Sequence, residues 1–320
     1  MKPLTECPAC SAVSAAAAEV LCAPVSAGEV RLRCVLVRCT ACRHVFMNPQ
    51  AQPAELAAFY DENYHVFKDR PLSSAEIERF IATHFDGELL NHAAFVPGGK
   101  FLDVGCGLGD MVAAMQAAGM NAHGIDPSPR AVQVARQAGR SVELGDLCDR
   151  RYADCEFDSI SMYHSLEHTA QPLLMLRECA RILKPAGQLT VAVPNIEALN
   201  AELFGREWSH LSLPYHLQHF TKRSLERVAR RAGLRCTHIA TESLVSSIDV
   251  ELCRWFRRHL LVPYRLSRRL GVFQPFARYL AGRGQRADRG EAIVARFGVA
   301  QRSRKTAPSM ADAPTACPST

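Results

Sequence analysis

The sequence lacks the long apolar segments that mark membrane-spanning or exported proteins. No apolar run approaches the roughly 18 residues that a membrane-spanning helix needs, so we expect no transmembrane segment. The residues from Met1 to Cys7 contain no apolar core of the kind that a secretory signal peptide carries. The 13 cysteines are therefore expected in a reducing cytoplasm, as free thiols or as metal ligands.

Internal repeats and a strong charge imbalance are also missing. The absence of a repeat excludes a repeat architecture. The net charge of +6 is mildly basic, which allows contact with phosphates or anionic lipid without requiring it. What remains is an ordinary composition, 48% hydrophobic and 22% charged over 320 residues, which suffices for one full α/β domain with additions.

The glycine-rich stretch from Asp103 to Gly109 carries the first positive signal. It follows an apolar segment, residues 101–104, that we expect to be a strand, and it precedes a helix that begins near Met111. Glycine lets the backbone approach a ligand closely, and the start of a helix offers free N–H groups. The spacing lacks the G-x-G-x-x-G pattern, and Asp103 is a poor neighbour for a pyrophosphate, which disfavours a nicotinamide-dependent dehydrogenase. The acid suits a ligand that bears an ammonium group.

Apolar runs alternate with helical patterns through residues 100–242, which predicts βαβ units and a parallel sheet. The strand at 122–126 ends at Asp126, about 20 residues beyond the glycines, where a carboxylate can accept hydrogen bonds from both ribose hydroxyls of a nucleoside. Ser128 is expected to cap the next helix. Further strands are expected at 141–144, 157–163, 188–195, 234–241 and 291–297, and helices at 173–184, 224–232 and 244–261.

Two C-x2-C pairs stand near the start of the chain. Their members are Cys7, Cys10, Cys39 and Cys42. Four thiolates can surround a zinc ion in a closed tetrahedral site, which is structural rather than catalytic. Unrelated thiols and a redox pair are the alternatives. Nucleic-acid binding is not expected, because the pairs lack an aromatic stripe and few basic residues accompany them. Those basic residues are Arg38, Arg43 and His44.

The motif D-V-G-C-G-L-G, together with the two cysteine pairs, resembles class I S-adenosylmethionine (SAM)-dependent methyltransferases of types 11, 12 and 23 with an N-terminal zinc-binding segment. The resemblance implies an α/β fold with a Rossmann-like, seven-stranded sheet, helices on both faces, a zinc-ribbon-like N-terminal segment and a helical insert before the last strand. It also implies a SAM pocket in which Asp146 takes the adenine amino group and Leu147 packs near the ring. The implied pocket residues are Asp103, Gly105, Gly107, Asp126, Pro127, Asp146, Leu147 and Tyr163.

Two histidine-rich stretches are candidates for the acceptor side of this pocket. The first, Y-H-S-L-E-H at 163–168, resembles the fourth-strand motif of the family that includes the ubiquinone-pathway O-methyltransferases, in which the corresponding Glu and His lie at the active site. The second, at 208–220, resembles the loop after strand five in the same zinc-bearing family. Structural hydrogen bonding and a metal site are alternatives, although the H-x-x-H spacing lacks the glutamate of a zincin. The candidate general bases, in order, are His168, His164, His216 and His219.

We expect the chain to be organised in six parts. They are a zinc-ribbon-like segment at 1–50, a helical connector at 51–99, the SAM-binding core at 100–242, a basic helical insert at 243–290, the last core strand at 291–300 and a disordered tail at 301–320. The connector should contain helices at 53–60 and 74–95. Tyr60 and Tyr64 either pack it onto the core or, by the resemblance, lie near the mouth of the pocket.

The basic insert carries ten arginines from Arg254 to Arg289 against a single acid, Asp288. Such a stretch, punctuated by aromatic residues, could lie on an anionic membrane; the alternative is a solvated helical surface or one that pairs with the mate of a homodimer. We expect a cytoplasmic enzyme that methylates a small-molecule, lipid-linked or sugar-linked acceptor on oxygen or carbon, with peripheral contact at the inner membrane face as a second expectation. The alternative function is a zinc-bearing protein that binds RNA or a protein partner on an inactive SAM-binding fold.

Overall fold

The computed structural model describes residues 1–13, 18–27, 30–52, 55–56, 70–85, 96–243, 245–260 and 264–300. The strands are β1 (Ala18–Ala27), β2 (Val30–Arg38), β3 (Val45–Met47), β4 (Lys100–Val104), β5 (Asn121–Asp126), β6 (Val142–Leu144), β7 (Phe157–Tyr163), β8 (Leu183–Pro194), β9 (Gln218–His219), β10 (Leu234–Glu242) and β11 (Ala292–Val299). The α-helices are α2 (Ser74–Phe85), α4 (Asp110–Ala117), α5 (Pro129–Gln137), α6 (Pro172–Ile182), α7 (Leu199–Phe204), α8 (Lys222–Arg231), α9 (Val245–Leu260), α10 (Tyr264–Leu270) and α11 (Gln274–Arg286). Short 3-10 turns are η2 (Leu166–His168), η3 (Gly205–Glu207) and η4 (Ser209–Leu211).

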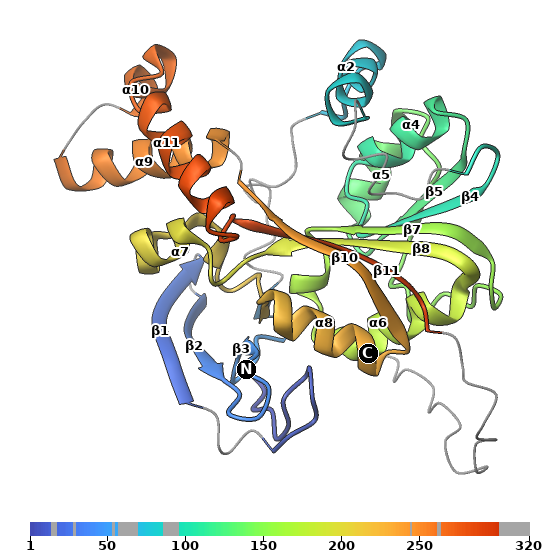
Figure 1. Ribbon diagram of the computed structural model, residues 1–320, viewed down its shortest axis with the longest axis horizontal. Coiled ribbons are helices and arrows are strands. Elements are labelled where there is room, and N and C mark those ends of the chain that lie inside the picture. Colours follow the sequence, from blue (N-terminus) through green and yellow to red (C-terminus); the bar gives the residue numbers. More distant parts are fainter. Residues whose placement is uncertain are drawn as a thin grey trace.

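Seven strands form the central sheet, in the order β10-β11-β8-β7-β4-β5-β6. The strands from β8 to β6 in this order run parallel, whereas β11 lies antiparallel to both β8 and β10. Helices cover both faces of the sheet: α4 and α5 lie on one side, and α6 and α8 lie on the other (Figure 1). The predicted α/β fold with a seven-stranded sheet is therefore confirmed.

Alternate side chains of the central strands fill two hydrophobic cores. Phe101 of β4 is buried with Val112 and Met115 of α4. The next residue, Leu102, belongs to the opposite core, with Ile160 of β7. Successive side chains of a strand point to opposite faces, so each strand serves both cores. Because both faces are covered, the carboxyl ends of the parallel strands remain the place where a ligand can bind.

One predicted helix ends earlier than expected, and another is described only in part. The helix expected at 173–184 ends at Ile182, and Leu183 already pairs with Phe157 as the first residue of β8. Pro185 explains this, because a residue that precedes proline is disfavoured in helical conformation. Of the helix expected at 74–95, the described part is α2. Several other predictions lie outside the described residues: the remainder of that helix, Tyr60, Tyr64, the tail at 301–320, and the helix at 53–60 except for residues 55–56. The predicted helix cap at Ser128 is confirmed, and Thr221 caps α8.

The N-terminal segment forms a four-stranded antiparallel sheet in the order β1-β2-β3-β9. Its last strand, β9, comes from the stretch that follows β8, so a piece of the core completes the N-terminal sheet. His44, one of the few basic residues that accompany the cysteine pairs, does not lie at the surface. Its ring is fully buried, with Nε2 at 3.0 Å from Gln218 Oε1 and Nδ1 at 3.3 Å from Ser224 Oγ. The segment is thus fixed to the core by buried polar contacts.

The insert before β11 forms α9, α10 and α11, which project away from the central sheet (Figure 1). Asn200 of α7 ties it to the core, because its Nδ2 donates to Glu251 Oε2 of α9 and to Glu291 Oε2 at the start of β11, each at 2.9 Å. Among the helices of the described ranges, none combines the length and the apolar character needed to cross a membrane.

Candidate active site

The loop between β4 and α4 holds its glycines in a left-handed backbone conformation. The φ angles of Gly105, Gly107 and Gly109 are +73°, +53° and +73°. A Cβ on Gly105 would lie 2.4 Å from the Cβ of Ser165, so the loop after β7 can approach this closely only because the residue is glycine. A Cβ on Gly107 would meet no atom within 4 Å. This part of the loop therefore offers space in which a ligand could lie against the backbone.

Asp103 lies near the end of β4 and is only 4% exposed. Its Oδ1 accepts a hydrogen bond from Ser161 Oγ of β7 at 2.5 Å. Burial raises the pKa of Asp103 to about 7, against the effect of this hydrogen bond, and the nearby charge of Asp126 adds to the rise. A cationic ligand would favour the ionised carboxylate in this poorly solvated place. The sequence did not reveal Ser161, since a serine inside a strand carries no motif.

Asp126 is the last residue of β5 and is 6% exposed. Its Oδ2 accepts from the backbone N–H of Gly107 and its Oδ1 from that of Ser128, each at 2.8 Å. Each carboxylate oxygen has a further lone pair that a ligand hydroxyl could use. Burial raises the pKa of Asp126, whereas the two N–H groups and the charge of His168 act against this rise. The carboxylate is thus attached to the glycine loop and lies near the histidine-rich side of the site.

The other predicted cofactor residues follow the carboxyl ends of β5, β6 and β7. Pro127 is exposed in the turn after β5. Asp146 is exposed and its Oδ1 accepts from the backbone N–H of Cys148 at 2.8 Å, whereas Leu147 is buried in the core. Burial raises the pKa of Tyr163, whose hydroxyl is buried and makes no hydrogen bond within the described ranges. These residues lie at one edge of the sheet, where the carboxyl ends of parallel strands meet.

Glu167 lies at the centre of the histidine-rich half of the site. It is fully buried in η2, and its Oε1 is 3.3 Å from His164 Nδ1 and 3.9 Å from His216 Nε2. Burial acts to raise the pKa of Glu167, but the hydrogen bond with His164 and the charges of His164, His216 and His168 lower it to about 2. The carboxylate is therefore ionised at neutral pH. Its Oε2 makes no hydrogen bond in the part of the chain that the structure describes.

The loops after β7 and β8 bring four histidine rings together around this carboxylate. The rings of His168 and His216 meet edge to face at 4.7 Å between centroids, and those of His164 and His210 are stacked at 6.2 Å. Burial lowers the pKa of His168, and it lowers that of His216 to about 3 and that of His210 to about 4. For His164 burial also acts downward, but Glu167 prevails and raises the pKa. The four rings therefore differ in the direction of their pKa shifts although they are neighbours.

The hydrogen bond of His168 fixes which ring nitrogen carries the proton. Its Nδ1 is 3.2 Å from the carbonyl oxygen of Tyr215, and a carbonyl can only accept, so Nδ1 is the donor. The neutral ring then has its lone pair on Nε2. The lowered pKa keeps this neutral form populated near pH 7. His168 is thus a base with a defined tautomer.

His219, the fourth candidate base, is set apart from the others. It lies in β9 opposite Val45 of β3 and is 3% exposed, with its ring 6.4 Å from that of His216. This placement favours a packing role. His210, whose ring stands 5.6 Å from that of Trp208, belongs to the histidine-rich stretch at 208–220 but was not among the candidate bases.

The donor set around Glu167 could also hold a cation. One ligand atom each from Glu167, His168 and His216 lies within 4.8 Å of the others. A carboxylate oxygen with two imidazole nitrogens suits a divalent transition metal. If the histidines bind a metal ion, its ligands would therefore be these three residues.

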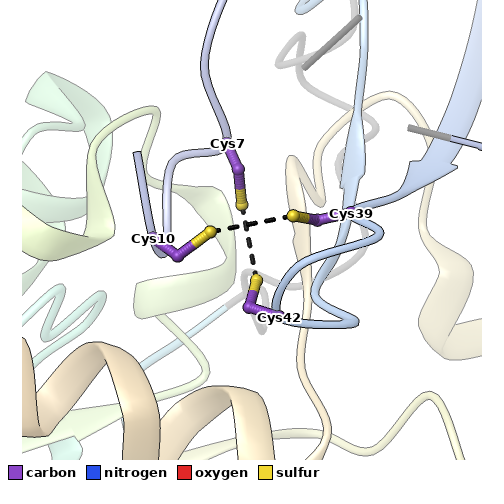
Figure 2. A group of neighbouring side chains, drawn as sticks. All are labelled: Cys7, Cys10, Cys39 and Cys42. Carbon is purple, nitrogen blue, oxygen red and sulfur yellow. Dashed lines mark hydrogen bonds between the residues drawn. The ribbon is translucent and has the colours of Figure 1, made fainter. Parts of the chain in front are cut away.

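The four cysteines of the two pairs converge on one point (Figure 2). The Sγ atoms of Cys7 and Cys42 are 3.6 Å apart, and those of Cys10 and Cys39 are 3.7 Å apart. All four sulfur atoms lie within 4.8 Å of one another. A tetrahedral zinc ion with Zn–S distances of about 2.3 Å would separate its sulfur ligands by about 3.8 Å. The donor set and its dimensions fit that ion.

A cleft of about 580 Å³ lies between the N-terminal sheet and α7. Leu21, Leu36 and Leu211 form part of its apolar wall, and Trp208 also lines it. The Trp208 ring is the neighbour of His210, so the cleft adjoins the histidine-rich stretch. Its volume lies within the range of small-molecule sites.

We predict that protonation of His219 destabilises the fold in acid. Burial, together with the nearby His44, lowers the pKa of His219 to about 3, compared with about 6.5 in an unfolded chain. The neutral His219 imidazole therefore makes its full contribution to the free energy of unfolding above about pH 6.5, and this contribution is lost as the pH falls toward 3. Replacing His219 by Gln should reduce the slope of stability against pH by up to about 1.4 kcal/mol per pH unit in this window.

Urea denaturation at a series of pH values measures this slope. The matched control is His238→Gln, at an exposed position of β10, which should keep the slope of the parent protein. An unchanged slope in the His219 variant would contradict the assignment of a buried neutral imidazole.

Comparison with known proteins agrees with this architecture. The ubiquinone biosynthesis O-methyltransferase of Thiobacillus denitrificans is 35% identical over 150 residues, which are 43% of this chain and 65%, slightly less than two thirds, of that protein. The enzyme of the same name from Aromatoleum aromaticum is 29% identical over 206 residues, covering 60% of this chain and 87% of its own length. A chain of the solved complex between the Haloferax volcanii Trm112 methyltransferase activator and a methyltransferase superposes with a TM-score of 0.50 at 20% identity, over 71% of this chain and 95% of that one, a likeness of fold alone.

Two further matches decide the family. The ubiquinone biosynthesis O-methyltransferase of Pseudomonas aeruginosa is 30% identical over 163 residues, covering 47% of this chain and 70% of that protein. The model of the methyltransferase domain family matches residues 74–239, just over half of the chain, and this range contains the glycine loop, Asp126 and the histidine-bearing loop after β7. The chain therefore belongs to the methyltransferase domain family, and its cofactor is SAM.

Proposed function

We propose that this protein transfers the methyl group of SAM to a hydroxyl oxygen of a small-molecule acceptor, with His168 as the general base. The observation that carries the proposal is the position of His168, which lies close enough to both Asp126 and Glu167 to interact with their charges. Asp126 belongs to the cofactor side and Glu167 to the histidine-rich side. A base at this junction would face both the cofactor and the acceptor.

The residues of the cofactor side suit the separate parts of SAM. Asp103 would hold the ammonium group in its buried site, and the open face of Gly107 would lie against the methionine portion. Asp126 would accept from the ribose hydroxyls, and Asp146 would accept from the adenine amino group. When bound, SAM supplies a methyl group that is already activated on a sulfonium, so positioning and exclusion of water are the main contributions of the protein.

His168 would accept the acceptor's hydroxyl proton at Nε2, because Nδ1 donates to Tyr215. The imidazolium that results would be stabilised by the ionised Glu167 carboxylate. His164, whose Nδ1 is 3.3 Å from Oε1, holds this carboxylate and acts as a positioning residue. The names of the relatives, O-methyltransferases of ubiquinone biosynthesis, favour oxygen over carbon and a phenolic ring as the acceptor. The cleft beside Trp208 would then receive a non-reacting part of the acceptor.

We further propose that Cys7, Cys10, Cys39 and Cys42 bind a structural zinc ion. Four sulfur donors leave no open coordination position, so such an ion takes no part in the reaction. These cysteines belong to the same buried cluster as residues of α6 and α8, among them Leu225. Zinc would therefore stabilise the junction between the N-terminal segment and the core.

We predict that Asp126→Asn weakens SAM binding about tenfold or more. The substitution removes the charge that strengthens hydrogen bonds from ligand hydroxyls, and hydrogen bonds to charged groups contribute about 1.5–3 kcal/mol each. Isothermal titration calorimetry with SAM measures the change in Kd. Asp149→Asn, in an exposed turn, is the control and should bind like the parent protein. Equal affinity in the Asp126 and Asp149 variants would refute the assignment of the cofactor side.

We predict that His168→Gln lowers kcat by about a hundredfold or more and leaves the Kd for SAM unchanged, because a general base typically contributes 10²–10⁴ in rate. Transfer of a labelled methyl group from SAM to catechol, the simplest vicinal phenolic acceptor, and to an alkyl-substituted catechol measures kcat. The parent protein should lose activity in acid, below the ordinary histidine pKa, since that of His168 is lowered.

His238→Gln provides a matched control for the His168 variant. It should retain the parent kcat, because it lies on β10 and is exposed. A parent rate no higher than background with both catechols would contradict O-methylation of phenols. A His168 variant with the parent kcat would exclude its role as base.

We predict about one zinc ion per chain in protein purified without chelator. The double variant Cys39→Ser, Cys42→Ser should lose the metal and unfold at a lower temperature, because two of four ligands are gone and structural zinc contributes to folding. Elemental analysis and thermal denaturation measure the two effects. Cys155→Ser, at an exposed free cysteine, should change neither. Parent protein that contains no zinc would contradict the proposal.

A further inference from the structure

Exposed apolar side chains gather at the outer end of the helical insert. Leu270, Val272, Phe276 and Tyr279 are 66%, 55%, 47% and 53% exposed. They run from the end of α10, through the turn, into the first half of α11. Single exposed apolar residues are ordinary, but a contiguous group marks a surface for interaction. We call these four residues the apolar ridge.

The apolar ridge is held in its outward orientation by the packing of α11. The opposite face of this helix is buried, with Ala277 fully inaccessible, and it packs on α9 and α7. At the start of α11 the ring of Phe273 stacks on that of Phe256 of α9, with 4.4 Å between centroids. The rings of Phe276 and Tyr279 stack on each other at 6.2 Å on the exposed side. The helix therefore cannot turn its ridge inward without losing this packing.

Exposed arginines border the apolar ridge. We call Arg269, Arg278, Arg283 and Arg286 the cationic rim, and all four are exposed. The guanidinium carbon of Arg283 lies 6.0 Å from the centre of the Tyr279 ring, and its Nη1 donates to the Tyr279 hydroxyl at 3.3 Å. Within the described ranges, no rim arginine forms an ion pair with a carboxylate. Among the described residues, no carboxylate therefore neutralises the positive charge beside the ridge.

We propose that the apolar ridge inserts into the surface of an anionic membrane while the cationic rim contacts the lipid phosphates. Apolar and aromatic side chains flanked by arginines fit the boundary between acyl chains and headgroups. A second copy of the chain fits less well, because two cationic rims would face each other. RNA also fits less well, since the aliphatic members of the ridge offer no ring for stacking. Figure 1 shows α10 at the end of the insert that projects from the central sheet, where a flat surface could reach it.

Flotation of the full chain with vesicles tests the proposal. The protein should bind vesicles of phosphatidylcholine mixed with phosphatidylglycerol at low salt, and it should bind phosphatidylcholine alone weakly, with the difference reduced at high salt. The double variant Phe276→Ser, Tyr279→Ser should bind the mixed vesicles at least about tenfold more weakly, because it removes two aromatic anchors. The variant Arg283→Ser should bind about fivefold more weakly, as expected for one arginine near the surface.

Two control variants separate this surface from general effects. Leu144→Ser removes a 49% exposed leucine at the end of β6, and Arg230→Ser removes an exposed arginine of α8; both should bind like the parent protein. Failure of the parent to float with the mixed vesicles would overturn the proposal. So would equal weakening by ridge and control variants, or ridge variants that abolish a dimer or RNA binding but leave flotation intact.

Discussion

A carboxylate buried away from water organises the histidine-rich half of the candidate active site. Glu167 is fully buried, and an isolated charge in such a place would be strongly destabilising, so it requires the imidazoles that face it. His164 comes from the same loop, whereas His216 arrives from the stretch after β8. The Glu167 carbonyl also accepts from the Leu217 N–H at 2.9 Å. One residue therefore joins two loops in a single geometry, and it raises the pKa of His164 while burial lowers those of His168 and His216.

The N-terminal segment depends on the same stretch of chain. Residues 218–219 leave the histidine-rich region and become β9 of the N-terminal sheet, where His219 pairs with Val45 and Gln218 with Phe46. The four cysteines lie in a hydrophobic cluster shared with the core. A metal bound by these cysteines would thus support the histidine-rich stretch through β3 and β9, without contact with the reacting groups. This arrangement gives a physical reason for a structural ion at a distance from the chemistry.

Much of the cofactor side could be read from the sequence because its determinants are local. The glycines and Asp103 stand within a few residues of each other, and Asp126 ends the very next strand, so parallel pairing of β4 with β5 brings them to one edge. The same holds for the cap at Ser128, whereas the seven-stranded sheet was expected from the resemblance to methyltransferases and its strand order was not predicted. The contacts of Ser161 with Asp103 and of Ser165 with Gly105 were not predictable, because each joins residues about sixty positions apart without a motif.

By itself, the sequence determined the fold class, the cofactor loop, the paired cysteines and the histidine-rich stretches, since periodicity and short spacings specify strands, turns and ligand pairs. Only the tertiary structure decided the burial and the contacts of each histidine. Burial depresses the pKa of His168 although the charge of Glu167 acts against it, whereas the hydrogen bond and charge of Glu167 prevail over burial and raise the pKa of His164. Burial in β9 separates His219 from both, and none of these effects has a counterpart in local spacing. The burial of His44 and the outward apolar ridge on α11 were likewise decided by which faces found a packing partner. Solvation and charge act through space, so they become readable only once the chain has folded.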